Sequence, residues 1–137
     1  MEMRDIKFRG QKEKTEEWVY GSVILNNGLM SLIIPIGKTY YSSPTMIHEG
    51  VWVYTETISQ YTGLKDKNGR EIYEGDIVKS FIKGNSKVIF KDGVFCLESL
   101  KYKNICDIFG EIEVIGNIYE NEELITDWLM RVTINLY

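Results

Sequence analysis

Apolar and polar residues alternate along most of this chain with a period of two, and turn signals interrupt the alternation about every ten residues. Asn-Gly or Asp-Gly pairs stand at residues 27–28, 68–69 and 92–93, and both residues of such a pair tolerate a positive φ angle. β-Branched and aromatic residues are frequent between the turns. Strands are therefore predicted at residues 5–9, 18–25, 29–36, 40–41, 51–55, 61–64, 71–73, 77–79, around Phe81, 87–90, 94–98 and 111–118. This pattern favours an all-β barrel or sandwich over a helical fold.

One helix is predicted near the C-terminus, starting at Asn121. Asparagine is a good N-cap, and the two glutamates at residues 122–123 stand in the first turn, where the helix dipole favours acidic residues. One apolar stripe follows at helical spacing and comprises Leu124, Ile125, Trp128 and Leu129. The final residues, 131–137, alternate again and predict a terminal strand.

The length of 137 residues is enough for one domain with its own core or for two small units packed together. A weak boundary falls near residues 58–60, and these residues do not have the composition of a linker. The prediction is a single domain over residues 1–137, which can divide into two packed β subdomains, residues 1–58 and 59–137.

The charge balance and the two cysteines indicate a compartment. Sixteen basic and twenty acidic residues leave a formal net charge of −4, which gives the chain no general attraction to nucleic acid. Cys96 and Cys106 are expected to be reduced thiols, and a single bridge between them is left open. No apolar run reaches the length of a membrane span, and the N-terminus lacks the pattern of a signal peptide. The expected location is the cytoplasm, with no membrane partner.

Few residues suit catalysis or metal binding. His48 is the only histidine, and no Gly-x-Ser-x-Gly sequence presents a serine for it, so an enzyme that uses His48 is kept as an alternative only. The two cysteines are not part of a Cys-x-x-Cys pair, which disfavours structural zinc. Residues 63–70 match neither phosphate-loop spacing, and Asp66 and Asn68 are explained better by a hairpin turn than by a calcium loop. No enzyme, cofactor or metal site is predicted.

Basic and acidic residues separate into two neighbouring segments of the second half. Residues 79–103 hold six lysines and two acids, whereas residues 104–127 hold seven acids and no base. The lysines are Lys79, Lys83, Lys87, Lys91, Lys101 and Lys103. One interpretation, which is not the favoured one, is a face that binds a polyanion, with Phe90 or Phe95 stacking a base beside Lys87 and Lys91. The alternatives are complementary patches within the fold or between subunits, and lysines that protect an exposed strand edge.

Several sequence blocks resemble the YopX family of bacteriophage and prophage proteins. They are residues 4–10 (RDIKFRG), 18–21 (WVYG), 60–78 (QYTGLKDKNGREIYEGDIV) and 115–121 (IGNIYEN). The blocks extend over nearly the whole chain, and the central one is long enough to be specific. The residues after about position 125 depart from the family pattern.

The resemblance implies a mainly β protein encoded by a phage or an integrated prophage, without an established activity or catalytic residues. Within the central block, Gly63, Gly69 and Gly75 are predicted at positive φ in turns. Residues 74–79 (EGDIVK) are similar to the first strand of small SH3-like barrels, so a small β-barrel is expected for the C-terminal unit, packed with an N-terminal β unit. The predicted function is that of a non-enzymatic accessory protein that binds a protein partner or itself. Nucleic-acid binding through residues 79–103 is the alternative.

Overall fold

The computed structural model of the chain describes residues 3–39, 49–80, 84–100 and 102–125. Eleven strands lie in this part of the chain and form two sheets, so the predicted mainly β fold is confirmed. The strands are β1 (Phe8–Gln11), β2 (Trp18–Ile24), β3 (Met30–Pro35), β4 (Val51–Tyr54), β5 (Ser59–Lys65), β6 (Glu71–Tyr73), β7 (Asp76–Ser80), β8 (Gly84–Lys91), β9 (Val94–Leu97), β10 (Lys103–Asn104) and β11 (Glu113–Asn117). The short 3-10 helices are η1 (Thr55–Thr57), η2 (Glu98–Leu100), η3 (Ile105–Asp107) and η4 (Phe109–Glu111).

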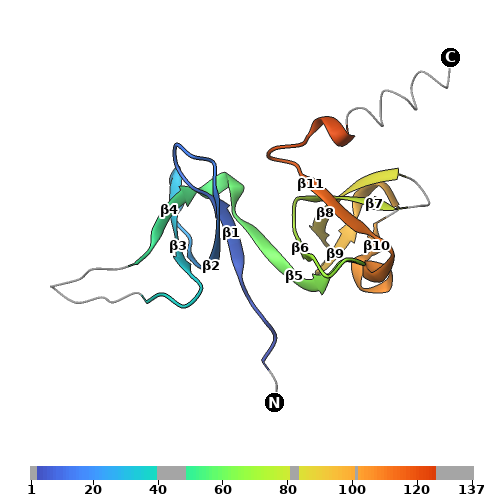
Figure 1. Cartoon of the computed structure of the whole chain (residues 1–137), viewed down its shortest axis with the longest axis horizontal. Helices are drawn as coiled ribbons and strands as arrows, with labels where there is room; N and C mark the ends of the chain where they lie inside the picture. The colour runs from blue at the N-terminus through green and yellow to red at the C-terminus, as the bar shows by residue number, and fades with distance from the viewer. Residues whose placement is uncertain (1–2, 40–48, 81–83, 101, 126–137) are drawn as a thin grey trace. The chain divides into compact units, whose positions relative to one another are not determined.

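The chain divides into two compact units, Met1–Tyr61 and Thr62–Tyr137, and strand β5 spans the division. The strand order in the N-terminal unit is β4-β3-β2-β1-β5. In the C-terminal unit β6 follows β5, and a separate sheet has the order β10-β9-β8-β7-β11. Figure 1 shows β1 to β4 side by side in the N-terminal unit.

The core of the N-terminal unit contains Ile33 of β3 and Val53 of β4, neither of which has any exposed surface. Gly10 of β1 lies against Val53, because a Cβ atom built at residue 10 would come within 2.7 Å of Val53 Cγ2. The missing side chain of Gly10 therefore lets β1 pass close to the core residue of β4.

The predicted hairpin at residues 26–28 is confirmed, but its turn is longer than a two-residue Asn-Gly turn. β2 and β3 pair as far as Ile24 and Leu32, and Gly28 does not have a positive φ. The loop is held instead by Ser31, whose hydroxyl oxygen accepts a hydrogen bond from the Asn26 backbone N–H at 2.9 Å.

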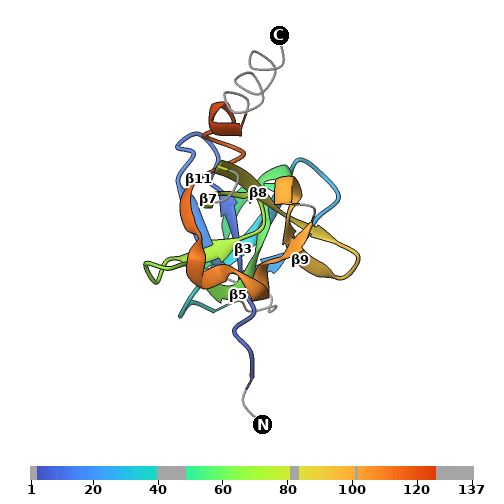
Figure 2. The same cartoon turned by 90° about the vertical axis from the view of Figure 1, so that its right-hand side faces the viewer.

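The core of the C-terminal unit is one apolar cluster. Val78 of β7, Val88 of β8 and Leu97 of β9 face it from three neighbouring strands and are fully buried. The other buried members are Ile72, Ile105, Ile108, Ile112 and Val114. β8 and β9 are joined by the predicted turn at Asp92 and Gly93, where φ is 52° and 83°, the pattern of a type I′ turn. Figure 2 shows these two strands extending together toward that turn.

The C-terminal sheet is open, so the predicted small SH3-like barrel is wrong. Side chains, and not a closing strand, occupy the outer edge of β11. The backbone N–H of Val114 donates to the Asp66 carboxylate at 2.9 Å, and the backbone N–H of Asn117 donates to the Asn121 side chain at 3.2 Å. An edge that is satisfied by side chains has no need of a further strand and offers little to pair with.

The predicted helix near the C-terminus is confirmed in its first turn, residues 123–125. The backbone N–H of Leu124 donates to the Asn121 carbonyl at 3.0 Å. The Asn121 side chain does not cap the helix, because its oxygen accepts the N–H of Asn117. The predictions at residues 40–41, Phe81, Trp128, Leu129 and 131–137 lie outside the described residues.

The central turn has three residues, 67–69, and not two. The Gly69 N–H donates to the Asp66 carbonyl at 3.0 Å, and the Asp66 N–H donates to the Arg70 carbonyl at 2.7 Å. This is the hairpin form in which a type I turn is followed by one residue with positive φ. The predicted positive φ is confirmed at Gly63, Gly69 and Gly75, with values of 87°, 81° and 84°.

Replacing Gly69 by Val is expected to lower the free energy of unfolding by about 1–3 kcal/mol. A Cβ atom at residue 69 would meet no atom within 4 Å, so the expected loss comes only from the φ of 81°. Thermal or chemical denaturation measures it. Gly69→Asn is the matched control, because asparagine tolerates this conformation better than valine and should cost less. Equal stability of the Val variant and the parent would contradict the turn geometry.

Candidate functional site

The predicted lysine site is spread over three strands of the C-terminal sheet. Lys79 lies on β7, Lys87 and Lys91 lie on β8, and Lys103 lies on β10. Lys83, Lys101 and His48 lie outside the described residues.

Lys87 and Lys91 stand at even spacing on β8 and therefore share one face of the hairpin. Lys87 Nζ forms an ion pair with Glu98 Oε2 at 3.3 Å. Lys91 Nζ lies 3.5 Å from the ring centroid of Tyr102, a cation–π contact. Both lysines thus have intramolecular partners.

The predicted seating of Phe90 and Phe95 beside the lysines is wrong. The two phenylalanines are paired directly across β8 and β9, with ring centroids 5.0 Å apart in an edge-to-face arrangement. Phe90 is an odd number of residues from both Lys87 and Lys91, so its ring projects from the opposite face of the hairpin. The aromatic ring that contacts Lys91 is that of Tyr102.

The acidic segment lies beside the basic one within the same sheet. Glu113 of β11 is the cross-strand neighbour of Lys79 on β7. Glu113 also lies 3.8 Å from Lys67 Nζ. These contacts support the interpretation of the charge separation as complementary patches within the fold. Polyanion binding through the six lysines stays a prediction.

One buried carboxylate, that of Asp66, binds several backbone N–H groups of the central block and of β11. Asp66 Oδ1 accepts the backbone N–H groups of Asn68 and Arg70, both at 2.9 Å, and Oδ2 accepts that of Val114 at 2.9 Å. Burial alone would raise the pKa of Asp66, but the hydrogen bonds from Val114, Arg70 and Asn68 and the positive charge of Arg70 together lower it. Asp66 is therefore a structural link between the central turn and β11.

Neither the thiols nor the carboxylates of the described residues form a metal site. Cys96 is buried, Cys106 is exposed, and both are free thiols. Burial raises the pKa of the Cys96 thiol, which makes it a poor nucleophile. Among the residues that the structure describes, no group of three His, Cys, Asp or Glu side chains is placed to hold a metal ion. In the same ranges, no helix has the length and hydrophobicity needed to cross a bilayer.

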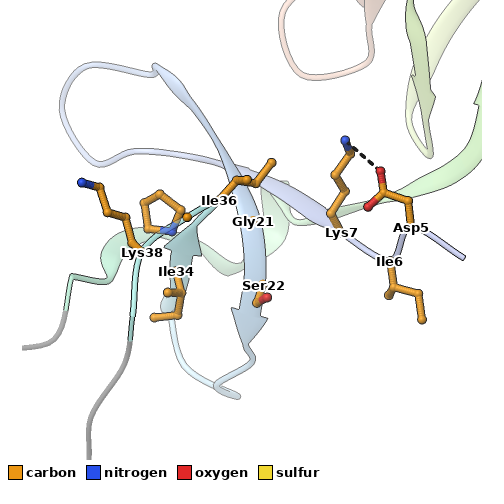
Figure 3. A pocket seen from close by; sticks show the side chains of 10 residues that line it. Asp5, Ile6, Lys7, Gly21, Ser22, Ile34, Ile36 and Lys38 are labelled. Carbon is orange, nitrogen blue, oxygen red and sulfur yellow. Dashed lines mark ion pairs between the residues drawn. The ribbon is translucent and has the colours of Figure 1, made fainter. Parts of the chain in front are cut away.

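The N-terminal unit contains a hollow of about 350 Å³, which we call the wedge. It is lined by residues 5–7 on one side, residues 21–22 of β2 on the other, and residues 34–38 at the end of β3. Figure 3 shows β2 and the segment before β1 diverging from each other at this place. A volume of this size lies within the range of small ligand sites.

The wedge exists because β2 continues where its pairing with β1 stops. The last pair of the two strands is Phe8 with Gly21, whereas β2 runs on to Ile24. The backbone carbonyl of Lys7 accepts the N–H of Tyr61 at 2.9 Å, so the chain before β1 follows β5. Among the described residues no strand pairs with this side of β2 beyond Gly21.

One residue of β2 directs its backbone groups to the side of the strand that β1 leaves beyond Gly21. The carbonyl of Tyr20 accepts the N–H of Ile36 at 3.2 Å, so the backbone groups of Tyr20 point toward β3. Because these groups alternate along an antiparallel strand, the N–H and C=O of Val23 point away from β3. Pro35 agrees with this alternation, since it stands opposite Gly21, at a position that needs no N–H for the β2–β3 ladder.

The rim of the wedge combines apolar and basic side chains. In Figure 3, Lys7 and Lys38 lie on either side of Ile36, which is well exposed. Lys7 Nζ forms an ion pair with Asp5 Oδ2 at 3.3 Å and lies 4.9 Å from the ring centroid of Tyr61. The Asp5 side chain is 65% exposed, so solvent screens this ion pair.

The wedge opens onto an apolar face of the sheet. Ile24, Leu32 and Trp52 stand opposite one another on β2, β3 and β4 and form a row on one face. Leu32 is buried, whereas Ile24 and Trp52 are 43% and 53% exposed. Ser22 and Ile34 belong to the same face by the period of two and also line the wedge. We call this surface the apolar face.

The amide proton of Val23 is expected to exchange with solvent on the order of 100-fold faster than those of Ser22 and Ile24. The N–H groups of Ser22 and Ile24 point toward β3 and have ladder partners. The Val23 N–H points to the other side of β2, where no strand of the described residues pairs with it. Residue-resolved hydrogen–deuterium exchange measures this difference. Equal protection of the three amides would show that another group covers this edge of β2.

Sequence reasoning missed the wedge. The alternation of residues 5–9 predicts one short strand with Ile6 and Phe8 on a common face, but β1 begins at Phe8 and Ile6 is exposed. The divergence depends on a hydrogen bond between Lys7 and Tyr61, which are far apart in the sequence. No local pattern carries that information.

A family model and a solved structure are similar to this chain. The family model described as YopX protein matches residues 7–126, which include all eleven strands. The crystal structure of protein EF1440 from Enterococcus faecalis is similar, with 30% sequence identity, a TM-score of 0.57, and coverage of 89% of this chain and 99% of that chain. No curated protein matches the chain.

Proposed function

This chain belongs to the YopX family, as the resemblance in its sequence implied, and we propose that it is a non-enzymatic module that binds protein through the apolar face of its N-terminal unit. The bound protein is a separate partner or a second copy of the chain. The proposal includes the expectation that the chain is an accessory protein of a phage or prophage and acts in the cytoplasm of the bacterial host.

The observation that supports this function is the exposure of the apolar face. Trp52 and Ile24 lie on either side of the buried Leu32, so their exposed surfaces belong to one row and are not scattered. Leu25 and Leu29, in the loop between β2 and β3, are also well exposed. Exposed apolar side chains that share one face of a folded chain are typical of an interaction site. Aromatic residues such as Trp52 contribute much of the binding energy in such sites.

The test compares Trp52→Ser with the parent chain. Capture from nuclease-treated host cells measures binding of a separate partner. Sedimentation velocity of the purified protein measures self-association. We expect the variant to lose at least about 10-fold in the amount captured or in the association constant, since burial of a large apolar side chain is worth about 1.5–3 kcal/mol. Phe109→Ser is the control, because Phe109 is an exposed aromatic residue of the other unit. Equal loss in both variants would contradict a role for the apolar face.

Capture with and without nuclease tests nucleic-acid binding, and a turnover assay tests the enzyme alternative. Nucleic-acid binding would appear as capture that nuclease abolishes and that replacing Lys79, Lys87, Lys91 and Lys103 by Glu removes. Its affinity would fall steeply with salt, because each phosphate contact releases condensed counterions. An enzyme would appear as a turnover that His48→Ala abolishes.

A further inference from the structure

We propose that the wedge binds an extended acidic peptide segment, which adds to β2 as a short strand. The inference rests on the proposed function, because it assumes a protein partner, and it names the chemistry of the segment that the partner supplies. Peptide recognition by strand addition combines main-chain hydrogen bonds for affinity with side-chain sites for specificity. The wedge has both.

The main-chain component is the unused edge of β2. The N–H and C=O of Val23 point away from β3, to the side of β2 that β1 has left two residues earlier, at Gly21. Ser22, the residue before Val23, lines the wedge. Strand β2 is held on its other side by β3 as far as Ile24, so the edge is already in strand conformation. An incoming strand thus pairs with a preorganised edge and loses little entropy on the protein side.

The side-chain component favours an acidic segment. Alternate residues of an added strand project onto the apolar face, where Ser22 and Ile34 line the wedge. Lys7 and Lys38 flank this surface, and Lys38 has no ion pair among the described residues. A glutamate at such a position can place its methylene groups on the isoleucine and its carboxylate near a lysine. The other face of the added strand lies beside Val23 and suits a β-branched residue.

Asp5 acts as an internal competitor for the peptide carboxylate. Its own carboxylate lies 3.3 Å from Lys7 Nζ, and its side chain is largely exposed. The Lys7 side chain is 14% exposed and the Asp5 side chain 65%, so a peptide carboxylate can replace the exposed Asp5 while Lys7 keeps its place beside Tyr61. This arrangement predicts that removal of the Asp5 charge strengthens peptide binding, a result that a merely structural ion pair would not produce.

The probes are the synthetic peptide Ac-Glu-Val-Glu-Val-Glu-NH2 and its neutral counterpart, in which glutamine replaces each glutamate. Calorimetry or fluorescence anisotropy at low ionic strength measures the dissociation constants with the full chain. We expect the acidic peptide to bind at least about 10-fold more tightly, and this preference to shrink at high salt. The Val23 amide should also become protected from exchange when the acidic peptide is added. Absence of binding by both peptides up to about 1 mM would overturn the inference.

Variants separate the two components. Val23→Pro removes the donor on the open edge without removing a ladder bond to β3, and we expect it to weaken binding at least about 10-fold. Val23→Thr retains the N–H and should stay within about 2-fold of the parent. Lys38→Glu should weaken acidic-peptide binding by about 10-fold, whereas Asp5→Asn should strengthen it. An N-methyl group on the central peptide bond of the acidic probe removes a donor from the peptide. This modified peptide tests the same edge with the parent protein, even where the Pro variant does not fold.

The outcomes distinguish this inference from the proposed function. If Trp52→Ser abolishes partner capture but neither peptide binds the parent chain, the apolar face is a protein-binding surface and strand addition in the wedge is wrong. If the acidic peptide protects Val23 but Trp52→Ser leaves capture unchanged, the wedge is a peptide site and the function assigned to the apolar face is wrong. Equal binding of the acidic and glutamine peptides would contradict the role of the lysines.

Discussion

Replacing Asp66 by Asn is expected to lower the free energy of unfolding of the C-terminal unit by about 2–4 kcal/mol. The carboxylate accepts three backbone N–H groups, two in the central turn and one from Val114 on β11. An asparagine can present oxygen to only one of these two sides, so its NH2 group must face a backbone N–H on the other. A donor then opposes a donor in a buried place, and the link between the turn and β11 is lost.

Chemical denaturation of the parent and the variant measures this effect, and Asp92→Asn is the matched control. Asp92 is an exposed residue of another hairpin turn in the same unit, with a positive φ that asparagine also tolerates. The control should therefore stay within about 0.5 kcal/mol of the parent. A similar change in both variants would show that the carboxylate of Asp66 is not a structural link.

The effect of Asp66 is expected to depend on pH in one direction. The pKa of Asp66 is lower in the folded chain than in the unfolded one, because the hydrogen bonds and the charge of Arg70 outweigh burial. Its contribution to stability is therefore fully present above the ordinary pKa of about 4 and is lost as pH falls through the folded value. The stability difference between the parent and Asp66→Asn should shrink in acid below about pH 4. A difference that grew in acid would contradict this assignment.

Replacing Gly21 by Ala is expected to destabilise the N-terminal unit by about 2–4 kcal/mol. A Cβ atom at residue 21 would collide with the backbone carbonyl oxygen of Ile34 and lie 3.0 Å from the Cα of Pro35. Because these obstacles are backbone atoms, no rotation of a side chain relieves them, and β2 and β3 must move apart. The same movement would disturb the wedge, of which Gly21 is a wall.

The comparison for Gly21→Ala is Gly28→Ala in the loop between the same two strands. Gly28 has no positive φ, and a Cβ atom there would meet only the Asn26 side chain, at 3.8 Å. This control should change stability by less than about 0.5 kcal/mol. Thermal denaturation of both variants checks the prediction, and comparable melting temperatures would contradict the close approach of β2 and β3 at Gly21.

Local patterns in the sequence determined the fold class and several turns. The period of two is a property of each strand by itself, so the mainly β fold was predictable without any long-range contact. The Asp92-Gly93 turn was predictable for the same reason, because positive φ at two successive residues is a local preference. The positive φ of Gly69 was also found, although the turn around it has three residues. Its extra length depends on the Asp66 side chain, which holds the N–H groups of Asn68 and Arg70.

Tertiary structure alone decided three features that local patterns did not predict, and the wedge is one of them. The open C-terminal sheet follows from Asp66, whose carboxylate occupies the edge of β11 by binding Val114. The separation of Phe90 from the lysine face follows from strand register. The wedge follows from the bond of Lys7 to Tyr61, which draws the chain away from β2, so that within the described residues no strand lies beside the Val23 backbone. Each depends on which distant segments meet, and alternation within a single segment is compatible with many such pairings.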